Sequence, residues 1–151
     1  MKITYKGDYA LKGILDLAYQ YKHNTVVPLS DISKRQDAPE KYLEQIMLIL
    51  KKTGIVGSKR GKGGGFFLVK SPKDITLGEV VRVIEGPIEP IACADCNYEV
   101  DCIDEKHCAF REVWTKVSNE ISEIVDNITF QDIMQRTDEL RSNETENMYY
   151  I

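Results

Sequence analysis

The chain has 151 residues, of which 42% are hydrophobic, and its formal net charge at pH 7 is −4. This length suits one compact domain with an appendage, and no run of about 18 uncharged apolar residues is present that could span a membrane. Because the N-terminal residues also lack the apolar core of a secretion signal, we expect a cytoplasmic protein with no membrane partner.

Positive charge is concentrated in one part of this acidic chain. Residues 34–73 carry ten Lys or Arg against three acidic residues, a local net charge of +7 that leaves −11 for the remainder. A basic surface on an acidic protein suits phosphate groups. Charge alone would favour an ordinary solvated surface, so the order of the surrounding elements has to decide.

Three helices are predicted in the first third of the chain. Apolar residues at helical spacing indicate an amphipathic helix over about residues 8–22. A short second helix is expected to begin at Pro28 and to end near Gln36. A third helix has Pro39 in its first turn, and its periodicity predicts a buried stripe formed by Leu43, Ile46, Met47 and Leu50.

A two-stranded hairpin is predicted to follow the third helix. Residues 55–59 and 66–69 have the composition of strands, and a basic, glycine-rich turn joins them. Three helices and such a hairpin describe a winged helix-turn-helix, a mainly α fold with a small β-hairpin, over residues 1–85. A nucleotide-phosphate loop is the competing interpretation of the glycines, but no Gly-Lys-Ser/Thr sequence and no helix follows them.

The third helix is expected to enter the major groove of DNA, and the hairpin tip to reach the adjacent minor groove. Glu44 can accept from a cytosine amino group, Gln45 can pair with adenine, and Tyr42 can contact phosphate or base. Glycines at the tip allow positive backbone dihedral angles and a close approach to phosphate. The predicted DNA-binding residues are Lys41, Tyr42, Glu44, Gln45, Arg60, Lys62 and Gly64.

Helices are also predicted after the hairpin. A short one over residues 76–84 is expected to close the core with Leu77, Val80, Val81 and Ile84. A long one, within residues 109–151, carries an apolar seam that the small winged domain cannot cover, which predicts pairing with a second copy. The seam consists of Phe110, Trp114, Val117, Ile121, Ile124 and Ile128, widened by Val113 and Val125.

The end of the chain is predicted to hold one more helix. Thr129 can cap it, and Phe130, Ile133, Met134 and Leu140 recur along it. Residues 142–151 are polar except at the very end, so we expect them to be loose or to form an arm onto a partner chain.

Four cysteines lie in an acidic segment, residues 86–108, that has little to bury: Cys93, Cys96, Cys102 and Cys108. Burial cannot easily offset the entropy of ordering such a segment, so we expect a thiolate-held metal centre to order it. Spacing alone fits zinc and an iron-sulfur cluster equally. A redox enzyme using Cys93 and Cys96 is disfavoured, because no strand-helix context and no acid, base or substrate pocket accompanies the pair.

Four separated motifs resemble the IscR/NsrR family of bacterial repressors. They are residues 3–11 (ITYKGDYAL), 39–45 (PEKYLEQ), 60–66 (RGKGGGF) and 127–129 (NIT). The resemblance implies a homodimer on double-stranded operator DNA, a long dimerisation helix, and an iron-sulfur cluster, [2Fe-2S] or [4Fe-4S], held by three cysteines. The family's spacing of five intervening residues matches Cys96, Cys102 and Cys108.

The fourth ligand departs from the family pattern. Where the branch that senses iron-sulfur status has a histidine, this chain has Arg111, which stays protonated and cannot ligate. The nitric-oxide-sensing branch resembles this chain at Asp8, which would reach the partner subunit's cluster, although a carboxylate at a helix start is also favoured by the helix dipole. Cys93 is an alternative because all-thiolate sites are common, and His107 is a third candidate.

We therefore expect a transcription repressor whose operator affinity depends on a cluster that senses iron-sulfur status, nitric oxide or oxidative stress. Cluster-assembly proteins would be its further partners. The alternative is a winged-helix repressor with a structural zinc site, or without metal, that a protein partner controls. Neither expectation is an enzyme.

Overall fold

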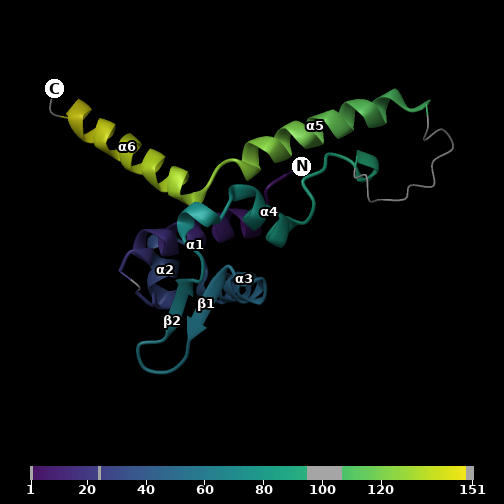
Figure 1. Ribbon diagram of the computed structural model, residues 1–151. Coiled ribbons are helices and arrows are strands. Elements are labelled where there is room, and N and C mark those ends of the chain that lie inside the picture. Colours follow the sequence, from purple (N-terminus) through teal and green to yellow (C-terminus); the bar gives the residue numbers. More distant parts are fainter. Residues whose placement is uncertain (1, 24, 95–106, 149–151) are drawn as a thin grey trace.

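The computed structural model describes residues 2–23, 25–94 and 107–148, with side chains up to residue 143. Figure 1 shows α1 to α4 and the hairpin gathered into one winged part, from which α5 and α6 extend in different directions. The elements in chain order are α1 (Tyr5–Tyr21), α2 (Leu29–Gln36), α3 (Glu40–Lys52), β1 (Val56–Lys59), β2 (Gly65–Leu68), η1 (Pro72–Asp74), α4 (Leu77–Glu85), η2 (Ala92–Ala94), α5 (Ala109–Asp126) and α6 (Phe130–Met148).

The three N-terminal helices form as predicted, with one change at the start of α1. Thr4 caps α1 by accepting a hydrogen bond from the Gly7 N–H (3.4 Å), so the helix begins three residues earlier than the apolar pattern indicated. α2 and α3 follow Pro28 and Pro39 directly. The predicted stripe of α3 is fully buried against α1 and α2.

The hairpin is antiparallel, and Val56 pairs with Leu68 and Lys59 with Gly65. Val27, before α2, lengthens this small sheet: its N–H and C=O both bond to the backbone of Phe66 at 2.8 Å. The first strand is one residue shorter than predicted, because Ile55 lies outside the ladder, and the second is shifted by one residue, because it includes Gly65 and leaves out Val69. The buried residues of the hairpin, Val56, Phe66 and Leu68, join the same core as α1 to α3.

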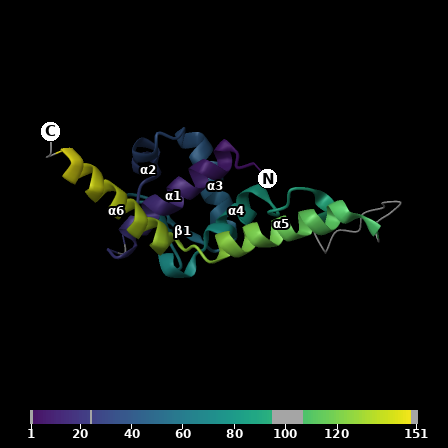
Figure 2. The same ribbon diagram turned by 90° about the horizontal axis from the view of Figure 1, so that it is seen from above.

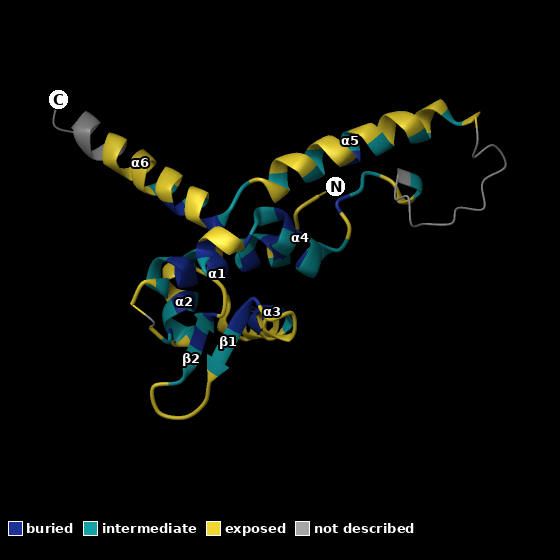
Figure 3. Ribbon diagram, viewed as in Figure 1, coloured by how far each residue is buried: buried dark blue, intermediate teal, exposed yellow. Residues whose placement is uncertain are grey.

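α4 closes this core, as Figure 3 shows by its buried positions. Val80, Val81 and Ile84 are buried as predicted, whereas Leu77, also expected in the core, is only half-buried because it lies in the first turn of the helix. Thr76 caps α4 by accepting from the Glu79 N–H at 3.1 Å.

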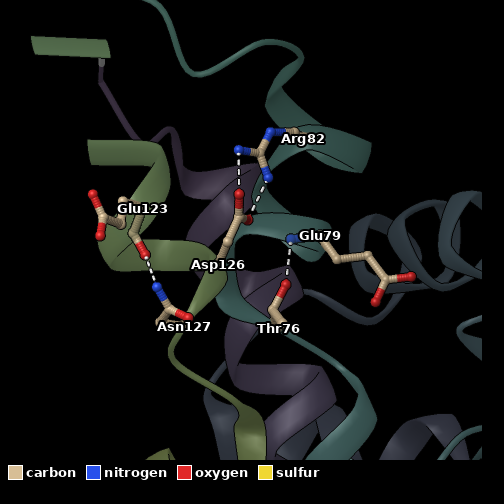
Figure 4. A network of polar contacts seen from close by, with 6 residues as sticks. All are labelled: Thr76, Glu79, Arg82, Glu123, Asp126 and Asn127. Carbon is tan, nitrogen blue, oxygen red and sulfur yellow. Dashed lines mark hydrogen bonds and ion pairs between the residues drawn. The ribbon is translucent and has the colours of Figure 1, made fainter. Parts of the chain in front are cut away.

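α4 and α5 are joined at one end by the polar network in Figure 4. Arg82 donates to both carboxylate oxygens of Asp126, at 2.5 and 2.9 Å, and the Asn127 side chain donates to the Glu123 carbonyl at 2.8 Å. Gly78 lets the two helices approach, because a side chain there would collide with Asp126 and Val125. The C-terminal end of α5 is therefore fixed to the winged part.

The apolar seam of α5 ends earlier than predicted, because the helix stops at Asp126 and Ile128 lies beyond it. The backbone after Asn127 instead pairs with the segment before α4: the Ile128 carbonyl accepts from Leu77 N (2.8 Å), and Phe130 N donates to the Ile75 carbonyl (3.0 Å). Much of the remaining seam is uncovered, and Phe110 is 78% exposed. Figure 3 shows α5 mostly exposed along its length.

α6 begins with a reciprocal cap, in which Thr129 N donates to the Asp132 carboxylate (2.8 Å) and Asp132 N donates to Thr129 Oγ1 (3.2 Å). Its first half packs on α1, where the Tyr19 hydroxyl donates to Asp138 at 2.9 Å. Residues 142–148, expected to be loose or to form an arm, continue the helix instead. No helix in the described part of the chain is long and apolar enough to cross a membrane.

Candidate functional site

The exposed face of α3 carries all four residues that the sequence assigned to it. Lys41, Tyr42, Glu44 and Gln45 are exposed, opposite the buried stripe. They lie within the first six positions of the helix, which begins where the Pro39 carbonyl accepts from Tyr42 N (3.0 Å) and Leu43 N (2.9 Å). Recognition helices contact base edges with these N-terminal positions, so the geometry fits the major-groove assignment.

The tip of the hairpin is narrow and basic. Arg60 and Lys62 are exposed, and Gly61 (φ 89°) and Gly63 (φ 73°) have the positive dihedral angles that the sequence predicted for the turn. Gly64 N donates to the Gly61 carbonyl at 2.8 Å, and a side chain at Gly64 would press on that carbonyl. Gly64 therefore shapes the tip and offers no side chain of its own to a ligand.

Two of the ten cations in residues 34–73 pair with carboxylates of the winged part itself. Arg35 donates twice to Asp16 at 2.7 Å, and Asp16 is only 6% exposed. The hydrogen bonds to Asp16 raise the pKa of Arg35. Burial of the guanidinium acts in the opposite direction but has the smaller effect. Lys70 pairs with Glu79 at 2.7 Å. By contrast, Lys59, Arg60 and Lys62 make no ion pair within the described ranges, so the tip keeps its charge for a ligand.

One feature of the sequence could have indicated the pair between Arg35 and Asp16, which a count of charges does not reveal. Asp16 lies on α1 among buried apolar positions, and a carboxylate in such surroundings needs a cationic or hydrogen-bonding partner. Gln36 Nε2 also donates to it, at 3.2 Å. Arg35 therefore joins α2 to α1 rather than extending the basic surface.

α3 and the hairpin are attached directly to each other. Lys51 Nζ, in the last turn of α3, donates to Ser58 Oγ on β1 at 2.6 Å, and Ile55 N donates to the Leu50 carbonyl at 3.2 Å. The two elements that the sequence assigns to DNA binding are therefore held together as one surface.

Only the two ends of the cysteine segment are described. Cys93 lies in η2, which packs against α5, and Cys108 occupies the N-cap position of α5 without a capping hydrogen bond from its side chain; both are half-buried free thiols. The Ser118 hydroxyl donates to the buried Ile88 carbonyl (2.9 Å), which holds the entrance of the segment on α5. Cys96 and Cys102 lie outside the described residues, and within those residues no three His, Cys, Asp or Glu side chains come together as a metal site.

The two remaining fourth-ligand candidates come from different parts of the fold. Asp8 lies half-buried in the first turn of α1 and accepts a 2.7 Å hydrogen bond from Lys12 Nζ, which raises the pKa of Lys12. His107 is exposed and lies directly before Cys108. Figures 1 and 2 show the described ends of the cysteine segment at the outer end of α5, whereas α1 lies in the winged part.

Glu85, the last residue of α4, joins the end of that helix to the start of α1, and no pattern in the sequence pointed to it. Its Oε1 accepts from both Thr4 N (2.9 Å) and Thr4 Oγ1 (2.7 Å). Gly7 leaves room for this carboxylate, which a side chain at that position would contact. Partial burial acts to raise the pKa of Glu85, but the hydrogen bonds from Thr4 and Gly7 and the charge of Lys6 outweigh it and lower the pKa. The partners are 81 positions apart, so no local spacing reveals them.

Known proteins share this architecture. The model of the Rrf2 family, described as an iron-dependent transcriptional regulator, matches residues 3–136. The HTH-type transcriptional regulator IscR of Erwinia tasmaniensis is 36% identical over 150 residues, which cover 95% of this chain and 88% of that protein. The HTH-type transcriptional regulator CymR of Bacillus subtilis is 33% identical over 151 residues and covers both chains completely.

Solved structures of such regulators have the same fold as this chain. The structure of T. potens IscR superposes with a TM-score of 0.73 at 32% identity, over 93% of this chain and 90% of that one. The structure of CymR, titled the global cysteine regulator of B. subtilis, gives a TM-score of 0.75 over 90% of this chain and 98% of that one. The predicted winged helix-turn-helix is thereby confirmed. The chain belongs to the Rrf2 family of transcriptional regulators, and it is a DNA-binding regulator of transcription rather than an enzyme.

Proposed function

We propose that this regulator is a homodimeric repressor whose operator affinity is controlled by an iron-sulfur cluster bound in residues 86–108. The observation that carries the proposal is that the cysteine segment leads directly into α5, the helix with an uncovered apolar face. Metal binding and subunit pairing would then act on the same element. Residues 1–85 would bind DNA, and residues 109–151 would pair the subunits.

DNA reading would use α3 and the hairpin tip together. Glu44, Gln45 and Tyr42 would face the bases, and Lys41 would contact the backbone beside them. Arg60 and Lys62 would reach the neighbouring minor groove over the narrow turn that Gly64 shapes. The unpaired charge at the tip supports this assignment, because phosphate neutralisation supplies most of the sequence-independent affinity.

Subunit pairing would bury the seam of α5. Phe110, Val113, Trp114 and Ile124 are exposed large apolar side chains on one helix, and such a contiguous face marks an interaction site. Pairing two copies would fix the separation of two α3 helices, as palindromic half-sites about one helical turn, roughly 34 Å, apart require.

The donor set fits a cluster. Cys96, Cys102 and Cys108 would supply thiolates, the ligands that iron-sulfur clusters prefer, and Asp8 of the other subunit, Cys93 or His107 would complete the site. Cys108 occupies the N-cap position of α5, where the helix dipole favours the negative charge of a thiolate. When bound, such a cluster provides a centre that nitric oxide, oxygen or iron shortage can remove.

The contacts of the winged part offer a route by which the cysteine segment would influence α3. The segment begins directly after Glu85, whose carboxylate binds Thr4 at the start of α1, and α1 packs on α3. Its far end enters α5, which Arg82 and Asp126 fix to α4. Ordering the segment would therefore bias both ends of the DNA-binding part.

Anaerobic purification tests the proposal. We expect coloured protein with iron and inorganic sulfide, and an operator affinity that changes when the cluster is removed. Replacing Cys96, Cys102 and Cys108 together by alanine should abolish the colour and the response, whereas Cys93→Ala, Asp8→Ala and His107→Ala tested singly would identify the fourth ligand. Colourless, iron-free protein after reconstitution with iron and sulfide would refute the cluster.

One observation favours a second candidate. The B. subtilis CymR matches this chain from end to end, and its structure is titled that of a global cysteine regulator. A regulator of that kind would use the same DNA-binding surface with a structural zinc or without metal, under the control of a protein partner. Without metal, the triple cysteine variant would bind its operator as tightly as the wild type. With a structural zinc, metal analysis of the wild type would find zinc and no iron or inorganic sulfide.

A further inference from the structure

We propose that Tyr9 is a positioning residue for DNA recognition, because its ring fixes the orientation of Tyr42 on the recognition helix. The inference rests on the proposed role of α3 in reading the operator. It adds to that role a residue of α1, a helix to which no DNA-reading side chain has been assigned.

The two rings form an edge-to-face pair. Their centroids are 6.0 Å apart, and their planes meet at 80°. This geometry lies within the range that aromatic quadrupoles favour. Tyr42 is the third residue of α3 and is 37% exposed, so its ring is covered by Tyr9 on one side while the remainder faces outward.

Tyr9 is held in place from behind. It is half-buried against the core, and its neighbour Ala10 is completely buried. Gly13, one turn further along α1, lets Met47 of α3 approach so closely that a side chain at Gly13 would displace the Met47 methyl group. The crossing of α1 and α3 is thus fixed near its middle, and the tyrosine pair lies toward the N-terminal end of α3, where base edges are read.

The hydroxyl of Tyr42 is available to a ligand. Within the described residues this hydroxyl takes part in no hydrogen bond, whereas the ring that carries it packs against the Tyr9 ring. Without that ring, the Tyr42 side chain would sample more rotamers before binding and would have to be ordered on the DNA. Tyr9 therefore lowers the entropic cost of operator binding, because the Tyr42 side chain is already ordered before the DNA binds.

A double-mutant cycle tests this inference on the full-length protein with an operator that the wild type selects from random DNA. Tyr9→Leu should weaken operator binding about three- to tenfold, and Tyr9→Phe, which keeps the ring, should stay within about twofold. Tyr42→Leu should weaken binding as well. Adding Tyr9→Leu to Tyr42→Leu should cost nothing further, because the side chain to be positioned is gone.

A control and a second measurement separate positioning from folding. Tyr5→Leu alters the same helix at an exposed ring that lies 6.5 Å from Tyr9, and it should leave the affinity unchanged. Tyr9→Leu should not change binding to DNA of unrelated sequence. Equal losses on operator and unrelated DNA, additive effects in the cycle, or an unchanged affinity of Tyr9→Leu would each overturn the inference. Failure of the wild type to select any sequence would instead refute the proposed reading by α3.

Discussion

Arg82 and Asp126 join α4 to the end of α5 through two hydrogen bonds of 2.5 and 2.9 Å, while most of α5 extends away from the winged part. The pair links α4, a helix of the winged part, to the helix with the uncovered face (Figure 4). It therefore sets the angle at which a second copy would present its own winged part.

Asp126→Asn should make the angle between α5 and the winged part more variable and should change the free energy of unfolding only slightly. Both side chains are partly solvated, so the loss of stability should be small, about 0.5–1 kcal/mol in urea unfolding. Operator binding, which needs two correctly spaced α3 helices, should weaken several-fold. Glu139→Gln, which breaks the exposed pair with Arg136 on α6, is the matched control and should change neither quantity. A stability loss without any loss of affinity would contradict this view of the pair.

Asp16→Asn should cost more, because Asp16 is nearly buried and accepts hydrogen bonds from both Arg35 and Gln36. Breaking a buried pair leaves a charge poorly compensated, although Arg35 is half-exposed and can be partly hydrated, so we expect about 2 kcal/mol in urea unfolding. Arg35→Gln should also lower stability, and it should leave the salt dependence of DNA binding unaltered. A reduced salt dependence would show that Arg35 contacts phosphate.

Glu85 predicts a specific pH dependence of stability. Because its pKa is lower in the folded state than the ordinary 4.5, its carboxylate stabilises the fold at neutral pH, and this contribution is lost as pH falls through the folded-state pKa. Glu85→Gln should lower the urea midpoint at pH about 7 and should approach the wild type as the pH falls below the folded-state pKa of Glu85, where both side chains are neutral. A constant difference between the two proteins at all pH values would argue against a charge effect.

The two parts of the DNA-binding surface should respond differently to substitution. Glu44→Ala should relax the base preference at one operator position, whereas Lys62→Ala should weaken binding to all sequences and lower the salt slope by about one. Selection from random DNA and titrations at several salt concentrations measure the two effects. An unaltered sequence preference of Glu44→Ala would remove Glu44 from the groove.

Val113→Glu should separate the subunits. Val113 is exposed on the seam of α5, and a charge there would have to be buried when two copies pair. Sedimentation should show monomers, and thermal unfolding should show an intact winged part, because Val113 contributes nothing to its core. Dimers of undiminished affinity would place the subunit contact elsewhere.

Local signals in the sequence predicted most of the fold. Prolines marked the starts of α2 and α3, periodicity identified the four buried residues of α3, and glycines identified the hairpin tip. The errors arose where distant segments meet. Ile128 leaves the helical seam because its carbonyl binds Leu77, and Arg35 leaves the basic surface because Asp16 lies on another helix. Glu85 and Thr4, like Tyr9 and Tyr42, become neighbours only after folding.

The bond pattern around Phe66 has a further consequence for the outer edge of β2. Val27 occupies both the N–H and the C=O of Phe66 on the outer side of β2, at 2.8 Å each. An open strand edge is a template on which a foreign strand can add. At Phe66 the chain itself already fills that edge, so a foreign strand would have to displace Val27 before it could pair along the full length of β2.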